Sequence, residues 1–195
     1  MKKETAGAMR TIILIHEVRG VTDNLRRLGD LLASRGFSVL VPSLYPDGFS
    51  GADEEAAYRK FFSEVGIESA KRTIDSLIDA LIDANPPGDV TVIGFSVGAT
   101  VAWLESANPA VKSVIGVYGS RIREYLDVSP LADTQLLFCA ERAFDVNAIL
   151  PPLNAKPRVT ARLIEGVHGF YSREDFDSPA IQGLNATLLA LLDRR

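Results

Sequence analysis

The chain has 195 residues, of which 47% are hydrophobic, with one cysteine, two histidines and a formal net charge of −4. This length and composition predict one domain whose core needs no disulfide framework, and the few cysteines and histidines leave little material for a metal site. The negative charge, without a basic cluster, argues against nucleic acid as a partner. The longest uncharged apolar stretch, residues 90–104, is too short to span a membrane.

The N-terminal residues 1–10 begin with positive charge but contain no long apolar segment. They are therefore expected to form a flexible leader rather than a signal peptide, with residues 11–195 forming the single domain of a cytoplasmic protein. The one cysteine, Cys139, lies inside an apolar run and is expected to belong to the core.

Segments typical of strands and of helices alternate along the chain. Short apolar, β-branched runs predict strands over residues 11–15, 38–41, 90–93, 111–118, 135–140 and 159–164. Helical spacing of apolar residues predicts helices over residues 23–35, 99–105 and 179–193, and a long tract over 54–84 that breaks near Gly66. Almost wholly apolar strands between helices predict a mostly parallel sheet covered on both faces, with functional groups at the carboxyl ends of the strands.

The pentapeptide Gly94–Gly98, a G-x-S-x-G pattern, stands between a predicted strand and a predicted helix. In this context the pattern is typical of a nucleophile elbow, where a sharp turn presents the serine above the sheet edge. The amino end of the following helix offers free N–H groups to a negatively charged oxygen. Ser96 is therefore the candidate nucleophile.

A serine nucleophile requires a histidine as base, and the chain offers His16 and His168. His168 follows the last predicted strand in a glycine-bracketed loop, and its late place matches the serine, acid, histidine order of α/β-hydrolases. We therefore expect His168 to be the base. His16, at the end of the first strand, is expected to have a structural role.

The acid that orients the histidine should follow the strand over residues 135–140. Two carboxylates meet this condition, Glu141 at the strand end and Asp145 four residues further on. Glu141 has the longer reach, whereas Asp145 could be delivered if the apolar residues before it fold inward. The sequence leaves both open, with a slight preference for Asp145.

The chain resembles the dienelactone hydrolase family along nearly its whole length. The resemblance rests on residues 13–20 (ILIHEVRG), 36–45 (GFSVLVPSLY), 94–99 (GFSVGA), 117–119 (VYG) and 166–170 (GVHGF). It implies a single-domain α/β-hydrolase with Ser96 as nucleophile and His168 as base. It also implies an oxyanion hole from the backbone N–H groups of Val18 and Val97, with Glu17 in the pocket beside the nucleophile.

Two positions depart from the family pattern. The founding members carry cysteine at the elbow where this chain has Ser96, which favours a general ester hydrolase over a strict dienelactone specialist. The family also places an aspartate in a G-x-x-D turn after the penultimate strand, where this chain reads Cys-Ala-Glu-Arg-Ala over residues 139–143. The acid is then supplied by Glu141 or Asp145, or it has been lost.

The predicted function is a serine hydrolase, without cofactor or metal, that cleaves an ester, lactone or thioester of a small substrate through an acyl-enzyme. The alternative is a catalytically silent hydrolase fold used for binding. A chain of this length leaves little sequence for a lid, so a minimal lid or none is expected, with residues 46–66 as the only cover over the pocket. We expect a monomer or homodimer, and assign no substrate role to Arg19, Arg59 or Arg173.

Overall fold

The computed structural model describes residues 10–84 and 89–193, and within them the chain forms a six-stranded, all-parallel sheet. The strand order is β2-β1-β3-β4-β5-β6. The strands are β1 (Thr11–Ile15), β2 (Ser38–Leu40), β3 (Val90–Phe95), β4 (Val111–Val117), β5 (Asp133–Ala140) and β6 (Val159–Val167). Since all six run the same way, their carboxyl ends lie along one edge of the sheet. Apart from Arg10, the predicted leader lies outside the described residues.

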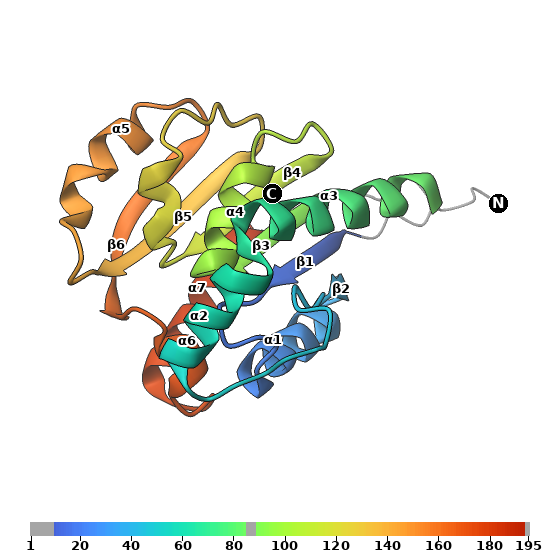
Figure 1. The fold of residues 1–195 in the computed structure, drawn as a ribbon. Coiled ribbons are helices and arrows are strands. Elements are labelled where there is room, and N and C mark those ends of the chain that lie inside the picture. Colours follow the sequence, from blue (N-terminus) through green and yellow to red (C-terminus); the bar gives the residue numbers. More distant parts are fainter. Residues whose placement is uncertain (1–9, 85–88, 194–195) are drawn as a thin grey trace.

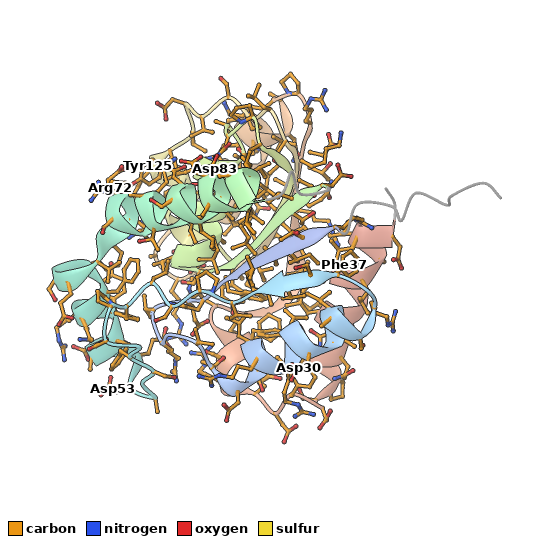
Figure 2. All side chains as sticks on the ribbon, turned by 90° about the vertical axis from the view of Figure 1, so that its right-hand side faces the viewer. Asp30, Phe37, Asp53, Arg72, Asp83 and Tyr125 are labelled. Carbon is orange, nitrogen blue, oxygen red and sulfur yellow. The ribbon has the colours of Figure 1, made fainter. Side chains whose placement is uncertain are left out.

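Helices cover both faces of the sheet (Figure 1). The α-helices are α1 (Asp23–Ser34), α2 (Glu54–Glu64), α3 (Gly66–Ala84), α4 (Val97–Glu105), α5 (Leu150–Asn154), α6 (Phe170–Arg173) and α7 (Pro179–Asp193). Two short 3-10 helices, η1 (Ser120–Glu124) and η2 (Val146–Ala148), follow β4 and β5. Figure 2 shows β1 and β2 lying between α3, which carries Arg72 and Asp83, and α1, which carries Asp30.

The alternation of side chains along the strands divides the core into two layers. On one face, Ile12 and Leu14 pack with leucines of α1 and α7. On the other face, Ile13 and Ile15 pack with the apolar sides of α2, α3 and α4. Burying both faces requires strands that are almost wholly apolar, as β1 is, between its neighbours β2 and β3.

The predicted single-domain α/β fold is confirmed, with differences at the ends of elements. The strand β3 continues through Gly94 to Phe95, and α4 begins at Val97 instead of residue 99. The strand β6 continues to Val167 rather than ending at residue 164, after a register shift against β5. The elements η1, η2, α5 and α6 were not predicted, because helices of three to five residues carry too little apolar periodicity to be read from sequence.

Two further expectations from the sequence concern the single cysteine and membrane-spanning segments. Cys139 is fully buried in β5, and burial raises the pKa of its thiol to about 12, as expected of a core residue. None of the helices formed by the described residues is both long and apolar enough to cross a membrane.

Glu105, the last residue of α4, has a buried carboxyl group. The side chain of Glu105 is wholly buried, accepts a hydrogen bond from Asn108 Nδ2 at 3.1 Å, and has Lys71 Nζ 3.5 Å from its Oε1. Burial raises the pKa of this carboxyl to about 7, because lost hydration outweighs the attraction of a lysine that Asp75 shares. Compared with the unfolded chain, the folded protein therefore favours the protonated form of the Glu105 carboxyl.

The substitution Glu105→Gln should consequently stabilise the protein in a pH-dependent way. Since the pKa is higher in the folded than in the unfolded chain, wild-type stability falls as pH rises from about 4.5 to about 7, and the variant lacks this loss. We expect similar free energies of unfolding near pH 4.5 and an advantage of up to about 3 kcal/mol for the variant near pH 8. Urea unfolding at both pH values measures this, and a difference that does not change with pH would contradict it.

Candidate active site

The turn that carries Ser96 is strained and is possible only between glycines. Ser96 has φ 53° and ψ −115°, a left-handed conformation unfavourable for a residue with a side chain. A Cβ atom on Gly94 would lie 2.0 Å from the carbonyl oxygen of Gly98, and one on Gly98 would lie 2.5 Å from that of Ile15. The two glycines thus let β3, the start of α4 and the end of β1 approach closely, as expected of a nucleophile elbow.

His168 stands directly after β6 and reaches the serine. Its Nε2 lies 2.8 Å from Ser96 Oγ, and the imidazole packs against the ring of Tyr118 with the centroids 5.0 Å apart. The backbone carbonyl of His168 accepts a hydrogen bond from Arg173, on the short helix α6. The loop that was expected to hold the base therefore brings His168 to Ser96.

Glu141, rather than Asp145, lies at the other nitrogen of the imidazole. Glu141 Oε1 is 2.6 Å from His168 Nδ1. The reason is strand register: Ala140 of β5 pairs with Val167 of β6, so the next residues on the two strands are neighbours. Asp145 instead caps η2, its Oδ1 accepting from the backbone N–H of Asn147 at 2.9 Å. The slight preference for Asp145 was wrong, because that side chain is engaged within its own turn.

The three side chains form one directed chain of hydrogen bonds. A carboxylate only accepts, so Glu141 fixes the proton of a neutral His168 on Nδ1. Nε2 is then free to accept the proton of the Ser96 hydroxyl. The histidine side chain is 25% exposed and the glutamate 10%, so the pair is largely shielded from solvent. This is the arrangement that activates a serine.

Two backbone N–H groups near Ser96 are candidates for binding a ligand oxygen. Val97 begins α4, and Val18 follows β1 where Gly98 allows the two elements to touch. Both residues line the same cavity as Ser96. Neither N–H donates a hydrogen bond to another described residue, so both are available to a ligand oxygen.

Glu17 lies behind the cavity rather than in its wall. Its Oε1 accepts from Ser172 Oγ at 2.5 Å and its Oε2 from the Tyr118 hydroxyl at 3.0 Å, with Arg19 Nε 3.6 Å from Oε1. Burial raises the pKa of Glu17, and these hydrogen bonds oppose the rise. Glu17 is not among the residues that line the cavity. The expectation that it lies in the pocket is therefore not met, and a ligand in the cavity would not contact it.

The cavity over Ser96 has a volume of about 650 Å³. Its walls come from α2, from η1 and from the loop after β5, so residues 46–66 cover only part of it and that expectation was incomplete. The lining residues are Val18, Glu54, Tyr58, Ser96, Val97, Thr100, Ser120, Arg121, Arg123, Ala140, Glu141, Arg142, Ala143, Val167, His168 and Arg173. Sequence reasoning missed the η1 contribution, since no pattern distinguishes so short a helix from a loop.

The arginines considered from sequence have different surroundings. Arg59 is exposed and pairs with Glu55, away from the cavity. Arg19 and Arg173 both bind Glu54 Oε2, at 3.2 and 3.1 Å, and so tie the start of α2 to the site. Arg142, which no sequence argument singled out, lines the cavity in the loop after β5.

Across the described residues, His, Cys, Asp and Glu side chains nowhere gather in a group of three or more that could hold a metal ion.

Comparisons with known proteins agree with this geometry. The model of the dienelactone hydrolase family matches residues 1–150, a span that includes Ser96 and Glu141 and ends before His168. The uncharacterized protein YczH of Bacillus subtilis is 33% identical over 164 residues, covering 82% of this chain and 79% of that protein. A carboxymethylenebutenolidase of a Pseudomonas species is 24% identical over 208 residues, covering 94% of this chain and 84% of that protein.

Solved structures show the same fold. A Xanthomonas campestris protein, described as an α/β serine hydrolase without lid, superposes with a TM-score of 0.70 at 16% identity, covering 99% of this chain and 85% of that one. The chain spans about half the length of several further relatives, among them one from a Synechocystis species and one from Salmonella typhi, of which it covers 50% and 46%. With the elbow, the histidine and the family match in agreement, the chain belongs to the dienelactone hydrolase family and is a hydrolase.

Proposed function

We propose that Ser96, His168 and Glu141 form a catalytic triad that hydrolyses an ester, lactone or thioester of a small substrate through an acyl-enzyme. The observation that carries the proposal is the unbroken chain of hydrogen bonds from Glu141 through His168 to the strained Ser96, at 2.6 and 2.8 Å. Each distance lies within the range expected for proton transfer between these groups.

In the acylation step Ser96 Oγ attacks the carbonyl carbon while His168 Nε2 takes the hydroxyl proton. The imidazolium that results is stabilised by Glu141, and the oxyanion accepts hydrogen bonds from the N–H groups of Val18 and Val97. Collapse of the tetrahedral intermediate breaks the bond to the leaving group, which receives the proton from Nε2. Ser96 is left as an ester.

Deacylation runs the same steps with water as the nucleophile. His168 takes a proton from water, the hydroxide adds to the acyl carbon, and Ser96 leaves with the proton returned by Nε2. The partial exposure of the His168 side chain leaves a route for that water from the open cavity.

The cavity favours a small substrate with negative charge. Four arginines line it, against the two carboxylates Glu54 and Glu141. Arg121, Arg123 and Arg173 already bind carboxylate or carbonyl oxygens of the protein, whereas none of the described residues forms a hydrogen bond or ion pair with Arg142. A panel of esters that differ only in an acidic substituent tests whether Arg142 selects the substrate, with Arg142→Gln as the matched variant.

The silent-fold alternative arose from the absence of aspartate after the penultimate strand. Glu141 lies at the imidazole in its place, within hydrogen-bond distance of Nδ1. A carboxylate of either length can orient the imidazole and stabilise its cation. This contact supports the triad over the silent-fold alternative.

The substitution Ser96→Ala should lower the turnover of p-nitrophenyl esters by at least ~1000-fold, because no other described group can take the place of the nucleophile. The fold should remain intact, as alanine removes only the hydroxyl. A fluorophosphonate probe should label the wild type and not the variant, and circular dichroism provides the folding control. Retained turnover in a folded Ser96→Ala protein would rule out the proposal.

The pair Glu141→Gln and Asp145→Asn tests the position of the acid. Glu141→Gln keeps the shape but removes the charge that stabilises the imidazolium, so kcat should fall at least ~100-fold. Asp145→Asn makes the matched change in the same loop and should leave kcat unaltered, because Asp145 contacts only its own turn. If the two variants behave alike in stopped-flow ester hydrolysis, Glu141 is not the third member.

A further inference from the structure

His16, the histidine left without a catalytic role, makes two hydrogen bonds at the end of β1. Its Nδ1 lies 2.6 Å from the carbonyl oxygen of Glu17, and its Nε2 lies 2.8 Å from the backbone nitrogen of Leu44. The residue is 1% exposed, and its ring stacks on that of Tyr45 with an interplanar angle of 6°. The imidazole is therefore held from three sides.

The partners fix where the proton lies. The backbone N–H of Leu44 can only donate, so Nε2 accepts and carries no proton. In a neutral ring Nδ1 then holds the proton and donates it to the Glu17 carbonyl. Burial lowers the pKa of His16 to about 4, so the ring is neutral at physiological pH.

The carbonyl that His16 binds belongs to the same peptide group as the N–H of Val18. A hydrogen bond to the oxygen of a peptide draws electron density from its nitrogen, which makes the N–H a stronger donor, and it also fixes the plane of the group. The next peptide is held too, since the Tyr45 hydroxyl donates to the Val18 carbonyl at 2.6 Å. The Glu17–Val18 peptide therefore has a defined orientation before any ligand binds.

We propose that His16 is a positioning residue for the oxyanion hole, orienting and polarising the Glu17–Val18 peptide so that its N–H meets the oxygen of the tetrahedral intermediate. This role rests on the proposed hydrolase function, and specifically on Val18 as an oxyanion donor. His16 does not touch the substrate, because Val18 and not His16 lines the cavity.

A purely structural role would instead tie the loop at Leu44 to β1. The two roles use different nitrogens, and two substitutions separate them. In His16→Asn the side-chain amide can occupy the place of Nδ1 and donate to the Glu17 carbonyl, but cannot reach Leu44. In His16→Gln the amide oxygen can occupy the place of Nε2 and accept from Leu44, but leaves the Glu17 carbonyl without this donor.

We expect His16→Gln to lower kcat for p-nitrophenyl esters by ~10- to 100-fold with KM within ~3-fold of wild type, because only the transition state uses a fully formed oxyanion contact. His16→Asn should retain kcat within ~5-fold of the wild-type value. The affinity for a trifluoromethyl ketone, which mimics the tetrahedral state, should fall in parallel with kcat in His16→Gln. Equal kcat in both variants, or a loss only in His16→Asn, would overturn the proposal.

Thr91→Val is the matched control for lost stability. Thr91 Oγ1 and Ser113 Oγ form a buried hydrogen bond of 2.7 Å near the amino ends of β3 and β4, away from the site. The variant should lower the melting temperature and leave kcat unchanged.

The failure of the proposed function and the failure of the His16 role give different results. If the wild type lacks ester turnover or Ser96 labelling, the proposed function fails. If the wild type is active and His16→Gln has an unaltered kcat, only the role of His16 is refuted.

A measurement on the unaltered protein covers the case in which the variants do not fold. The chain has two histidines, so the nitrogen-15 signals of His16 are separated from those of His168 by comparison with His168→Ala. At neutral pH we expect His16 to show a protonated Nδ1 and an unprotonated Nε2. The opposite tautomer, or a doubly protonated ring, would remove the donor to the Glu17 carbonyl and overturn the proposal.

Discussion

The close approach of the elbow to the end of β1 is the constraint on which the rest of the site depends. The start of α4 can lie against the carbonyl groups of Ile15 and His16 only because residue 98 has no side chain. That contact brings Val18, just after β1, and Val97, at the start of α4, to the same cavity as Ser96. The strained turn is tied to the sheet, because the N–H of Ser96 donates to the carbonyl oxygen of Val117 at the end of β4 at 2.9 Å.

Glu141 illustrates how strand register can bring a carboxylate to the histidine where the family pattern has an aspartate in a turn. In a parallel pair the residues that follow two paired positions remain neighbours, so Ala140 opposite Val167 brings Glu141 beside His168. The longer side chain of glutamate then suits a position directly at the strand end. An aspartate four residues further on would have to leave its turn, in which it already accepts hydrogen bonds from Asn147.

The sequence was sufficient to predict the turn at Ser96, the approach of His168 to that serine and the layered α/β fold. These rest on strong local signals: glycines around Ser96, apolar strands and the late place of His168. The acid could not be chosen, because register between β5 and β6 depends on tertiary packing and on a shift near Ala140 that no local pattern reveals. Tyr118 and Ser172, which hold Glu17, were missed because contacts across 101 and 155 residues leave no trace in spacing.

An acyl group trapped on the nucleophile would test the triad most directly. The protein is mixed with a p-nitrophenyl ester, quenched in acid within the first turnover and examined by intact-mass and peptide mass spectrometry. We expect a burst of p-nitrophenol and a stoichiometric acyl adduct on the peptide that contains Ser96. Steady turnover with no adduct, or an adduct on any other residue, would contradict the acyl-enzyme mechanism.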